Sequence, residues 1–212
     1  MIHELRMYKC RPGGVAKAIE ASGTVGRRIR EGDKYGKLEG HWSSEFGLLN
    51  QYVHLWAYDD LGEMARLRGE LAKKEAWRNE FVPMMHPHIL TQTVRVMRPV
   101  IDMKLVEGEG NFYELRTYRL KTGSMAEFCE RMAKHMPARE KYSKNVGLWA
   151  GVMPDPNEVT HLWVYASLEE RAQARVGSQA DPDWKEFLGY AGTVIEEMNS
   201  TMLMPSPYSP RK

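Results

Sequence analysis

The spacing of apolar positions changes several times along the first hundred residues. Residues 2–10 alternate in character, include β-branched and aromatic side chains, and end at Arg-Pro-Gly-Gly, which predicts a strand and a turn. Residues 14–31 carry apolar side chains at helical spacing, and Asp59-Asp60 offers an N-cap for a second helix that extends to about residue 82. The remaining expected strands cover residues 38–43, 51–58 and 89–97. The resulting order, β-α-β-β-α-β, is that of the ferredoxin-like fold.

The same pattern occurs twice. HELRMYKCRPG (3–13) matches YELRTYRLKTG (113–123) at an offset of 113 − 3 = 110, and HLWAYDDL (54–61) matches HLWVYASL (161–168) at 161 − 54 = 107. A repeat of this length is domain-sized, so we interpret it as a tandem duplication in which the first copy holds three extra residues near its first helix. The second copy is expected to have elements at 112–120, 124–143, 145–152, 158–165, 167–197 and 199–204. We predict domains at 1–100 and 112–204, a linker at 101–111 and a proline-rich tail at 205–212.

Alternation along the strands separates two kinds of side chain. One face of each repeat is aliphatic, and the other carries Glu, Arg, Tyr, His and Trp. We expect the aliphatic face to pack under the helices. The other face, which is too aromatic for plain solvent exposure and too polar for an ordinary core, would then be enclosed between two sheets in a barrel.

Taken together, the segments HELRMYKCRPG, YELRTYRLKTG, HLWAYDDL and HLWVYASLEERAQAR resemble the NIPSNAP family of the dimeric α+β barrel superfamily. The resemblance covers both halves of the chain, although Gly62-Glu63-Met64 stands where the second repeat has Glu169-Glu170-Arg171. It implies an α+β fold in which tandem ferredoxin-like repeats form a dimeric α+β barrel, and a homodimer or higher homo-oligomer. The superfamily includes cofactor-free monooxygenases, isomerases, haem-binding enzymes and polyketide cyclases, whereas NIPSNAP proteins have no agreed reaction.

Composition narrows the classes of partner. The net charge of +2 gives no electrostatic case for nucleic acid, and two cysteines at non-equivalent positions favour a reducing compartment. We find no metal-ligand spacing, no nucleotide-binding motif and no apolar run of the roughly 20 residues that span a bilayer. The charged N-terminal segment does not resemble a targeting peptide. We therefore expect a cytoplasmic protein without a cofactor, a metal or a transmembrane segment.

The candidate site residues come from the polar and aromatic face. We take His41 and His54 as candidate catalytic bases, because imidazole exchanges protons near neutral pH. His41 breaks the repeat, since Leu148 occupies the equivalent position, and such asymmetry is typical of a single site on a symmetric scaffold. The candidate ligand-binding residues are Arg6, Tyr8, Trp56, Tyr58, Arg116, Tyr118, His161, Trp163 and Tyr165. The alternative for these residues is architectural, with ion-paired arginines and hydrogen-bonded histidines lining the barrel wall.

Three functions fit these observations. The first is a barrel that binds a small apolar, aromatic or acyl-type metabolite in a cleft between sheet and helices, with Arg6 or Arg116 holding a polar end. The second is a nucleotide-cofactor-independent enzyme, a monooxygenase or an isomerase. The third is an interaction or scaffold protein that binds a partner through its outer helices.

Overall fold

The computed structural model describes residues 1–106 and 111–212. Within them the chain forms two compact units, one of residues 1–96 with 204–211 and one of residues 97–203 with 212. The predicted linker, 101–111, includes residues 107–110, which lie outside the described residues.

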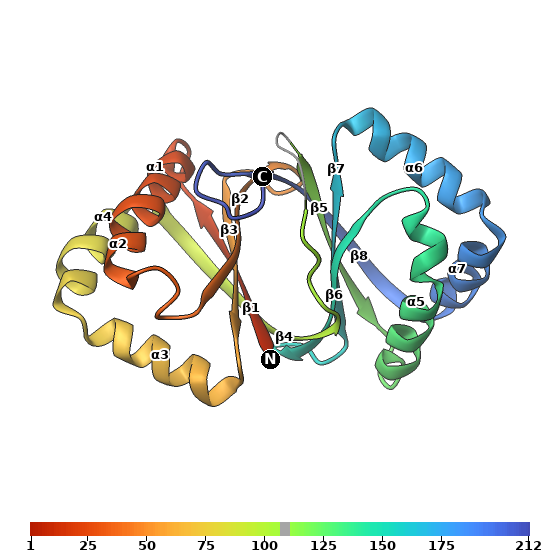
Figure 1. Ribbon diagram of the computed structural model, residues 1–212, viewed down its shortest axis with the longest axis horizontal. Helices are drawn as coiled ribbons and strands as arrows, with labels where there is room; N and C mark the ends of the chain where they lie inside the picture. Colours follow the sequence, from red (N-terminus) through yellow and green to blue (C-terminus); the bar gives the residue numbers. More distant parts are fainter. Residues whose placement is uncertain (107–110) are drawn as a thin grey trace. The chain divides into compact units, whose positions relative to one another are not determined.

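The first unit has the predicted β-α-β-β-α-β order, and its helices cover one face of its strands (Figure 1). Its elements are β1 (Ile2–Cys10), α1 (Gly14–Ala21), η1 (Ser22–Gly26), α2 (Arg27–Arg30), β2 (Lys37–Phe46), β3 (Gln51–Tyr58), α3 (Leu61–Lys73), η2 (Trp77–Phe81), α4 (Val82–Met85), η3 (His86–His88) and β4 (Ile89–Ile101). The strands lie in the order β4-β1-β3-β2. Antiparallel pairing places Arg6 opposite His54 and His54 opposite His41, so these three side chains share one face.

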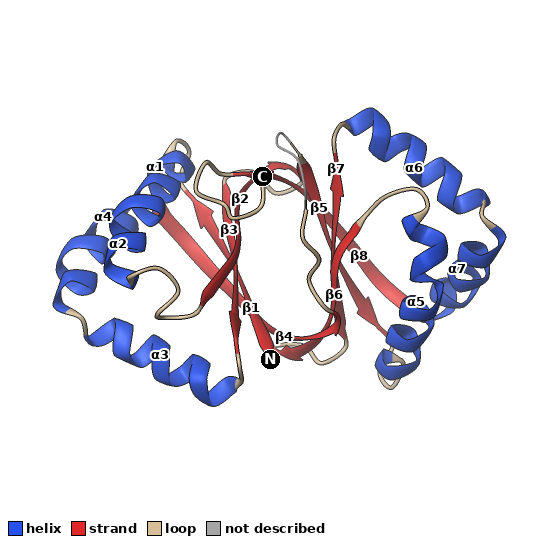
Figure 2. Ribbon diagram, in the orientation of Figure 1, coloured by secondary structure: helices blue, strands red, loops and turns tan. Residues whose placement is uncertain are grey.

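The second unit repeats this order with longer, more regular helices (Figure 2). Its elements are β5 (Phe112–Leu120), α5 (Met125–Glu140), β6 (Asn145–Met153), β7 (Glu158–Tyr165), α6 (Leu168–Ala180), α7 (Pro182–Val194) and β8 (Ile195–Pro205). The strand order is β8-β5-β7-β6. Arg116 lies opposite His161, as Arg6 does to His54, but the residue of β6 opposite His161 is Leu148.

The helix predicted over residues 167–197 is in fact two helices. Asp181 is extended and its side chain accepts hydrogen bonds from the backbone N–H groups of Asp183 and Trp184, while Pro182 occupies the first position of α7. An N-cap followed by proline starts a new helix, so α6 ends at Ala180. The last strand begins at Ile195 instead of residue 199. Ile195 is β-branched, which favours the extended backbone of a strand.

The expectation about the two faces of the strands was wrong. In both units the polar and aromatic face packs under the helices. The guanidinium of Arg30, from α2, lies 4.0 Å from the ring centroid of Trp56, and Arg139, from α5, lies 4.5 Å from that of Trp163. The helices themselves carry the arginines that pair with the strand glutamates and stack on the tryptophans, which makes this face the one they cover. The aliphatic face is buried as well, as Leu5 and Leu55 show.

Candidate functional site

A cavity of about 290 Å³ lies between the sheet and the helices of the first unit. Among the candidate residues of this unit, Arg6, Tyr8, His41, His54 and Trp56 line it, and Tyr58 does not. The opposite wall comes from the helices, through residues such as Ser22, Arg30, Trp77, Phe81 and Met85. The volume is at the small end of the roughly 300–1,000 Å³ usual for small-molecule sites.

The second unit has a cavity of about 140 Å³ at the corresponding place. All five candidate residues of this unit line it: Arg116, Tyr118, His161, Trp163 and Tyr165. Both repeats therefore have the same strand residues in the cavity lining, whereas the cavity volume differs about twofold.

The helix side explains this difference in volume. At the offset of 110, Ala18 and Ser22 of the first repeat correspond to Phe128 and Met132 of the second. Phe128 and Met132 are fully buried in the core of the second unit, with Met136 one turn further on. These residues lie four apart and so follow one face of the helix. Ser22 lines the cavity of the first unit, and its small side chain leaves space where Met132 belongs to the packed core of the second.

A π-helical turn follows the small residues of the first unit. The turn, η1, accommodates one residue more than an α-helical turn, so the offset between the repeats falls from 110 to 109 and Arg30 corresponds to Arg139. Two further residues enter before Tyr35, which brings the offset to 107. The sequence signals for this insertion are Gly23 and Gly26, which weaken an α-helix.

The conserved geometry of the two HLWxY segments is a tryptophan–histidine hydrogen bond. Trp56 Nε1–H donates to Nδ1 of His54 at 2.5 Å, and Trp163 Nε1–H donates to Nδ1 of His161 at 2.5 Å. Burial lowers the pKa of both histidines well below the ordinary value, with nearby arginine charges acting in the same direction, so both imidazoles are neutral at pH 7. A neutral imidazole that accepts at Nδ1 carries its proton on Nε2. Neither Nε2 has a hydrogen-bond partner among the described residues, and both are buried.

Each unit has a buried glutamate that pairs with arginines of the cavity lining. Arg6 and Arg68 both pair with Glu4, and Arg6 Nε also donates to the Tyr8 hydroxyl at 2.6 Å. Burial raises the pKa of Glu4, but the charges of Arg68 and Arg6 outweigh it and lower the pKa overall. Glu4 is therefore ionised. Arg6 is engaged by Glu4 and Tyr8, so it is not free to bind the polar end of a small molecule.

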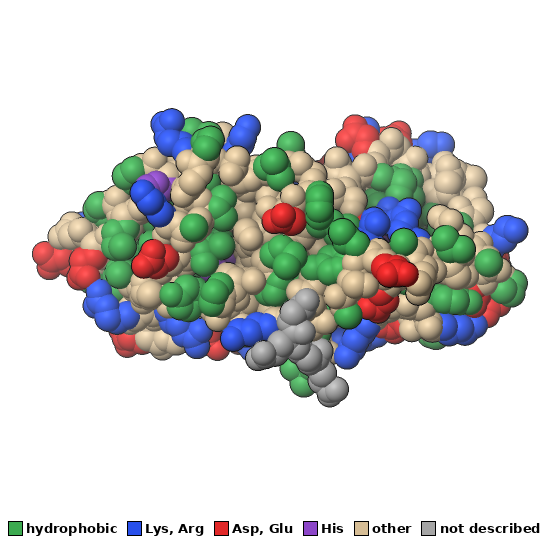
Figure 3. All heavy atoms as spheres, turned by 90° about the horizontal axis from the view of Figure 1, so that it is seen from above, with side chains coloured by type: hydrophobic (Ala, Val, Ile, Leu, Met, Phe, Trp, Pro, Cys, Tyr) green, Lys and Arg blue, Asp and Glu red, His purple; other side chains and the backbone are tan. Residues whose placement is uncertain are grey.

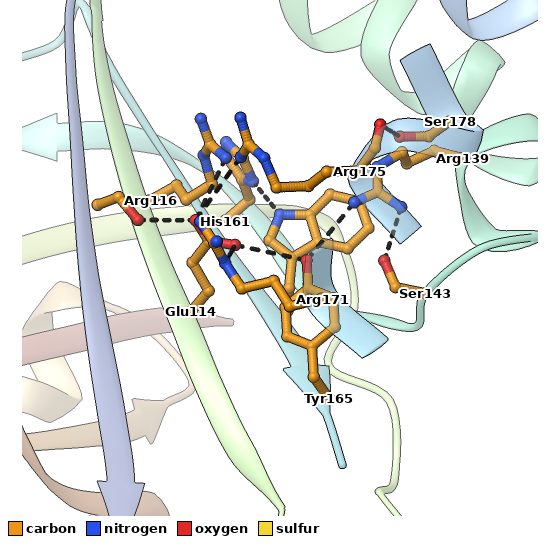
Figure 4. Close-up of polar contacts among 11 residues, drawn as sticks. Glu114, Arg116, Arg139, Ser143, His161, Tyr165, Arg171, Arg175 and Ser178 are labelled. Carbon is orange, nitrogen blue, oxygen red and sulfur yellow. Dashed lines mark hydrogen bonds and ion pairs between the residues drawn. The ribbon is translucent and has the colours of Figure 1, made fainter. Parts of the chain in front are cut away.

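The second repeat builds the same network with different helix residues. Arg171 donates to Glu114 at 2.9 and 2.8 Å, Arg116 at 3.2 Å, and Arg175 lies 4.0 Å away. Figure 4 shows Arg116, Arg171 and Arg175 gathered around this carboxylate. Met64 stands where the second repeat has Arg171, so in the first repeat Arg68, one turn later on the helix, provides the guanidinium.

Arg30 is the site residue that sequence reasoning missed. The short run Arg27-Arg28 with Arg30 has the pattern of a solvated helix face, yet Arg30 is only 6 % exposed and stacks on Trp56. Burial lowers the pKa of Arg30 to about 10, and the neighbouring Arg68 charge adds to this effect. The repeat is the signal that could have identified Arg30, because Arg139 occupies the corresponding helix position once the inserted turn is taken into account.

His41 has a different environment from the other site histidines. Its Nδ1 lies 2.5 Å from the Ser206 hydroxyl, its backbone N–H donates to Ser209 Oγ at 3.2 Å, and its Nε2 is buried with no partner among the described residues. Burial lowers the pKa of His41 to about 4, so its imidazole is neutral at pH 7. The geometry brings His41 and His54 together in one cavity, with ring centroids 6.4 Å apart.

The residues expected as a tail complete this cavity. Ser206, Ser209 and Arg211 are buried against the first unit, where Arg211 pairs with Glu39 of β2 at 2.7 Å. Tyr208 and Pro210 line the cavity. Tyr208 packs so closely on Gly23 that a Cβ at that glycine would lie 2.1 Å from the tyrosine ring.

Surface charge and the apolar character of the helices are the remaining features that bear on binding partners. On the face in Figure 3, acidic and basic side chains are interspersed instead of forming a field of one sign. None of the helices in residues 1–106 and 111–212 has the length and apolar character needed to cross a membrane.

The fold is similar to that of several solved structures. Solved structures that match nearly the whole chain include a protein from Lactobacillus acidophilus NCFM that has been proposed to be a monooxygenase, with a TM-score of 0.69, 14 % identity and coverage of 96 % of this chain and 92 % of that one. An anthrone oxidase-like protein matches with a TM-score of 0.69 and 9 % identity over 97 % of this chain and 91 % of that one. At these identities the likeness concerns the fold alone, and it confirms the predicted fold class, a dimeric α+β barrel.

The family follows from the sequence. The NIPSNAP family profile matches residues 3–103 and 113–210, one segment for each repeat. Protein NipSnap of Drosophila melanogaster is 25 % identical over 218 residues, which cover 99 % of this chain and 78 % of that protein. Protein NipSnap homolog 2 of Mus musculus is 27 % identical over 215 residues, which cover 99 % and 75 %. The chain belongs to the NIPSNAP family, as its repeated motifs predict.

Proposed function

We propose that the first repeat binds a small, mainly apolar molecule in the cavity between its sheet and its helices. The observation that carries this proposal is the contrast between the repeats: the same strand side chains face about 290 Å³ in one and about 140 Å³ in the other. Aromatic rings of Trp56, Trp77 and Phe81 flank the larger space. The proposal is one ligand per chain, and it gives the second repeat the role of a filled structural counterpart.

The first test is native mass spectrometry of the purified protein, followed by denaturing analysis of whatever is released. The pocket-filling variant Ser22→Met copies the residue that the second repeat has at this position, Met132, and we expect it to abolish retention of a ligand while folding normally. The matched control is Gln179→Met, which lines the smaller cavity and should leave retention unchanged.

For a protein that loses its ligand during purification, the same variants are compared with 1-anilinonaphthalene-8-sulfonate as the probe. Enhanced fluorescence in the wild type and in Gln179→Met, but not in Ser22→Met, supports the proposal. Equal fluorescence in all three proteins contradicts it. The same mass spectra report whether the chain forms a homodimer, which we propose from the fold class.

A second candidate is an enzyme that needs no nucleotide cofactor. The specific observation is His41, whose buried Nε2 lacks a partner among the described residues and which has no counterpart in the second repeat. The names of the two proteins of similar fold, one proposed to be a monooxygenase and one called anthrone oxidase-like, point in the same direction. A pKa of about 4 keeps His41 unprotonated but makes it a weak base, so we place binding first. Conversion of the released ligand by the wild type, lost in His41→Ala, would establish the enzyme.

A further inference from the structure

Arg30 is a buried cation without a counter-charge. It is 6 % exposed, and no carboxylate in residues 1–106 and 111–212 forms an ion pair with it. Its one hydrogen bond runs from Nη1 to the backbone carbonyl of Tyr35 at 3.1 Å. A guanidinium has five N–H donors, and Arg30, which lines the cavity, makes no other hydrogen bond among the described residues. Buried charges are normally paired, which makes this arrangement unusual for a purely structural residue.

The corresponding arginine of the second repeat has side-chain hydrogen-bond acceptors within its own unit. Arg139 Nη1 donates to the Ser143 hydroxyl at 2.6 Å, and Nη2 lies 3.5 Å from the Tyr165 hydroxyl. At the offset of 107 the first repeat has Gly36 in place of Ser143. Gly36 has φ +105°, and a Cβ there would meet the Tyr58 ring at 2.5 Å, so no hydroxyl can stand at this position. The first repeat therefore lacks the hydroxyl that Ser143 offers to the buried arginine of the second, and the Tyr58 hydroxyl, at the position of Tyr165, donates to Glu4 at 3.3 Å.

A second donor without an acceptor lies in the same cavity. His54 lines this cavity, its Nδ1 accepts from Trp56, and its Nε2–H is buried with no partner among the described residues. His54 and Arg30 both contact the Trp56 indole, with ring centroids of His54 and Trp56 5.9 Å apart. Asp33 also lines the cavity, but its carboxylate accepts the backbone N–H of Leu38 at 3.2 Å.

We propose that Arg30 and His54 form an anion site, and that the ligand of the first repeat is an organic carboxylate with a flat apolar body. This inference rests on the proposed function and names the chemical class of its ligand. The guanidinium fork matches the geometry of a carboxylate, and the neutral imidazole adds one directed N–H. The apolar body lies among Trp56, Trp77 and Phe81, and Arg6 and Arg68 stay with Glu4.

The test compares 2-naphthoate with 2-naphthamide, which has nearly the same shape and no charge, by isothermal titration calorimetry. We expect the wild type to bind naphthoate at least 10-fold more tightly than naphthamide, and Arg30→Gln to bind both equally. Arg28→Gln is the control, because Arg28 lies two residues away on the surface and pairs with Glu80. It should keep the wild-type preference.

The outcomes separate this inference from the proposed function. Equal binding of the two probes by the wild type overturns the anion site and leaves the cavity as a neutral site. Binding of neither probe at millimolar concentration contradicts both. Inorganic phosphate, added as a competitor, should displace naphthoate only weakly because it lacks the apolar body, and strong displacement would overturn the carboxylate assignment in favour of a phosphate.

A structural role for Arg30 is tested by Arg30→Met. Replacing a buried unpaired charge with an apolar side chain of similar length should leave the urea midpoint of the free protein unchanged or higher, while naphthoate binding is lost. A lower midpoint together with retained binding would mean that Arg30 only supports Trp56 and Trp77.

Discussion

The indole N–H of Trp56 donates to Nδ1 of His54 at 2.5 Å, and this bond sets what the histidine can do. In many active sites a carboxylate or carbonyl accepts from Nδ1–H and leaves Nε2 as a base. Here the neighbour is itself a donor, so the neutral ring holds its proton on Nε2. His54 is thereby suited to donating a hydrogen bond into the cavity, in contrast to the base expected from its sequence context.

The first prediction concerns this bond. Trp56→Phe removes the donor and leaves Nδ1 of His54 buried without a partner, which should lower the free energy of unfolding by about 1–3 kcal/mol. Trp163→Phe should cost a similar amount because its bond has the same length. Only Trp56→Phe should weaken naphthoate binding. Nitrogen-15 NMR of the wild type should show the Nε2–H tautomer for both His54 and His161, and an Nδ1–H tautomer at His54 would contradict the assignment.

The second prediction concerns the buried carboxylate of the second repeat. Glu114→Gln leaves Arg116 and Arg171 without their counter-charge, so urea denaturation at pH 7 should show a loss of about 3–5 kcal/mol. The exposed pair of Glu127 and Arg131 provides the control, because Glu127→Gln should change stability by less than about 1 kcal/mol.

The pH dependence of this loss has a definite sign. Burial raises the pKa of Glu114, but the hydrogen bonds from Arg171 and the charge of Arg116 lower it to about 2. Because the folded pKa lies below the ordinary value of 4.5, the ionised carboxylate stabilises the fold above pH 4.5, and this contribution disappears as the pH falls toward 2. The shift corresponds to about 3 kcal/mol. A difference between wild type and Glu114→Gln that stays constant from pH 7 to pH 3 would rule out this account.

The third prediction concerns Gly23, on which Tyr208 packs. Gly23→Ala places a methyl group where the Tyr208 ring lies, so residues 204–211 should detach from the helix and become accessible to protease and to hydrogen exchange. In an exposed helix the same change normally stabilises by roughly 1 kcal/mol, and Gly69→Ala, which meets no atom within 4 Å, should behave that way. Equal stabilisation by both substitutions would show that Tyr208 does not hold this segment in place.

Much of the fold could be predicted from the sequence, because the repeat fixes element order and strand period twice over. The boundaries of β1, β3, β5 and β7 agree closely with expectation. Alternation along a strand identifies which side chains share a face, but it cannot tell which face the helices cover. The helices were expected to cover the aliphatic face, and they cover the polar and aromatic face instead. Arg30 escaped notice because a short run of arginines has the same local pattern whether it is solvated or buried. The cavity has room where Ser22 is small, and the importance of this residue becomes clear only beside Met132 of the second repeat.

The wall that Tyr208 and Pro210 contribute has a consequence for synthesis. Residues 1–96 leave the ribosome first, but the segment that completes their unit is encoded more than one hundred residues later, after the whole second repeat. At roughly 5–20 residues per second, the nascent first repeat waits on the order of 5–20 s with an open cavity and an uncovered His41. A small molecule or a chaperone that meets the growing chain before residues 204–211 are made therefore encounters an open first unit, and the cavity gains this wall only after the second repeat has been synthesised.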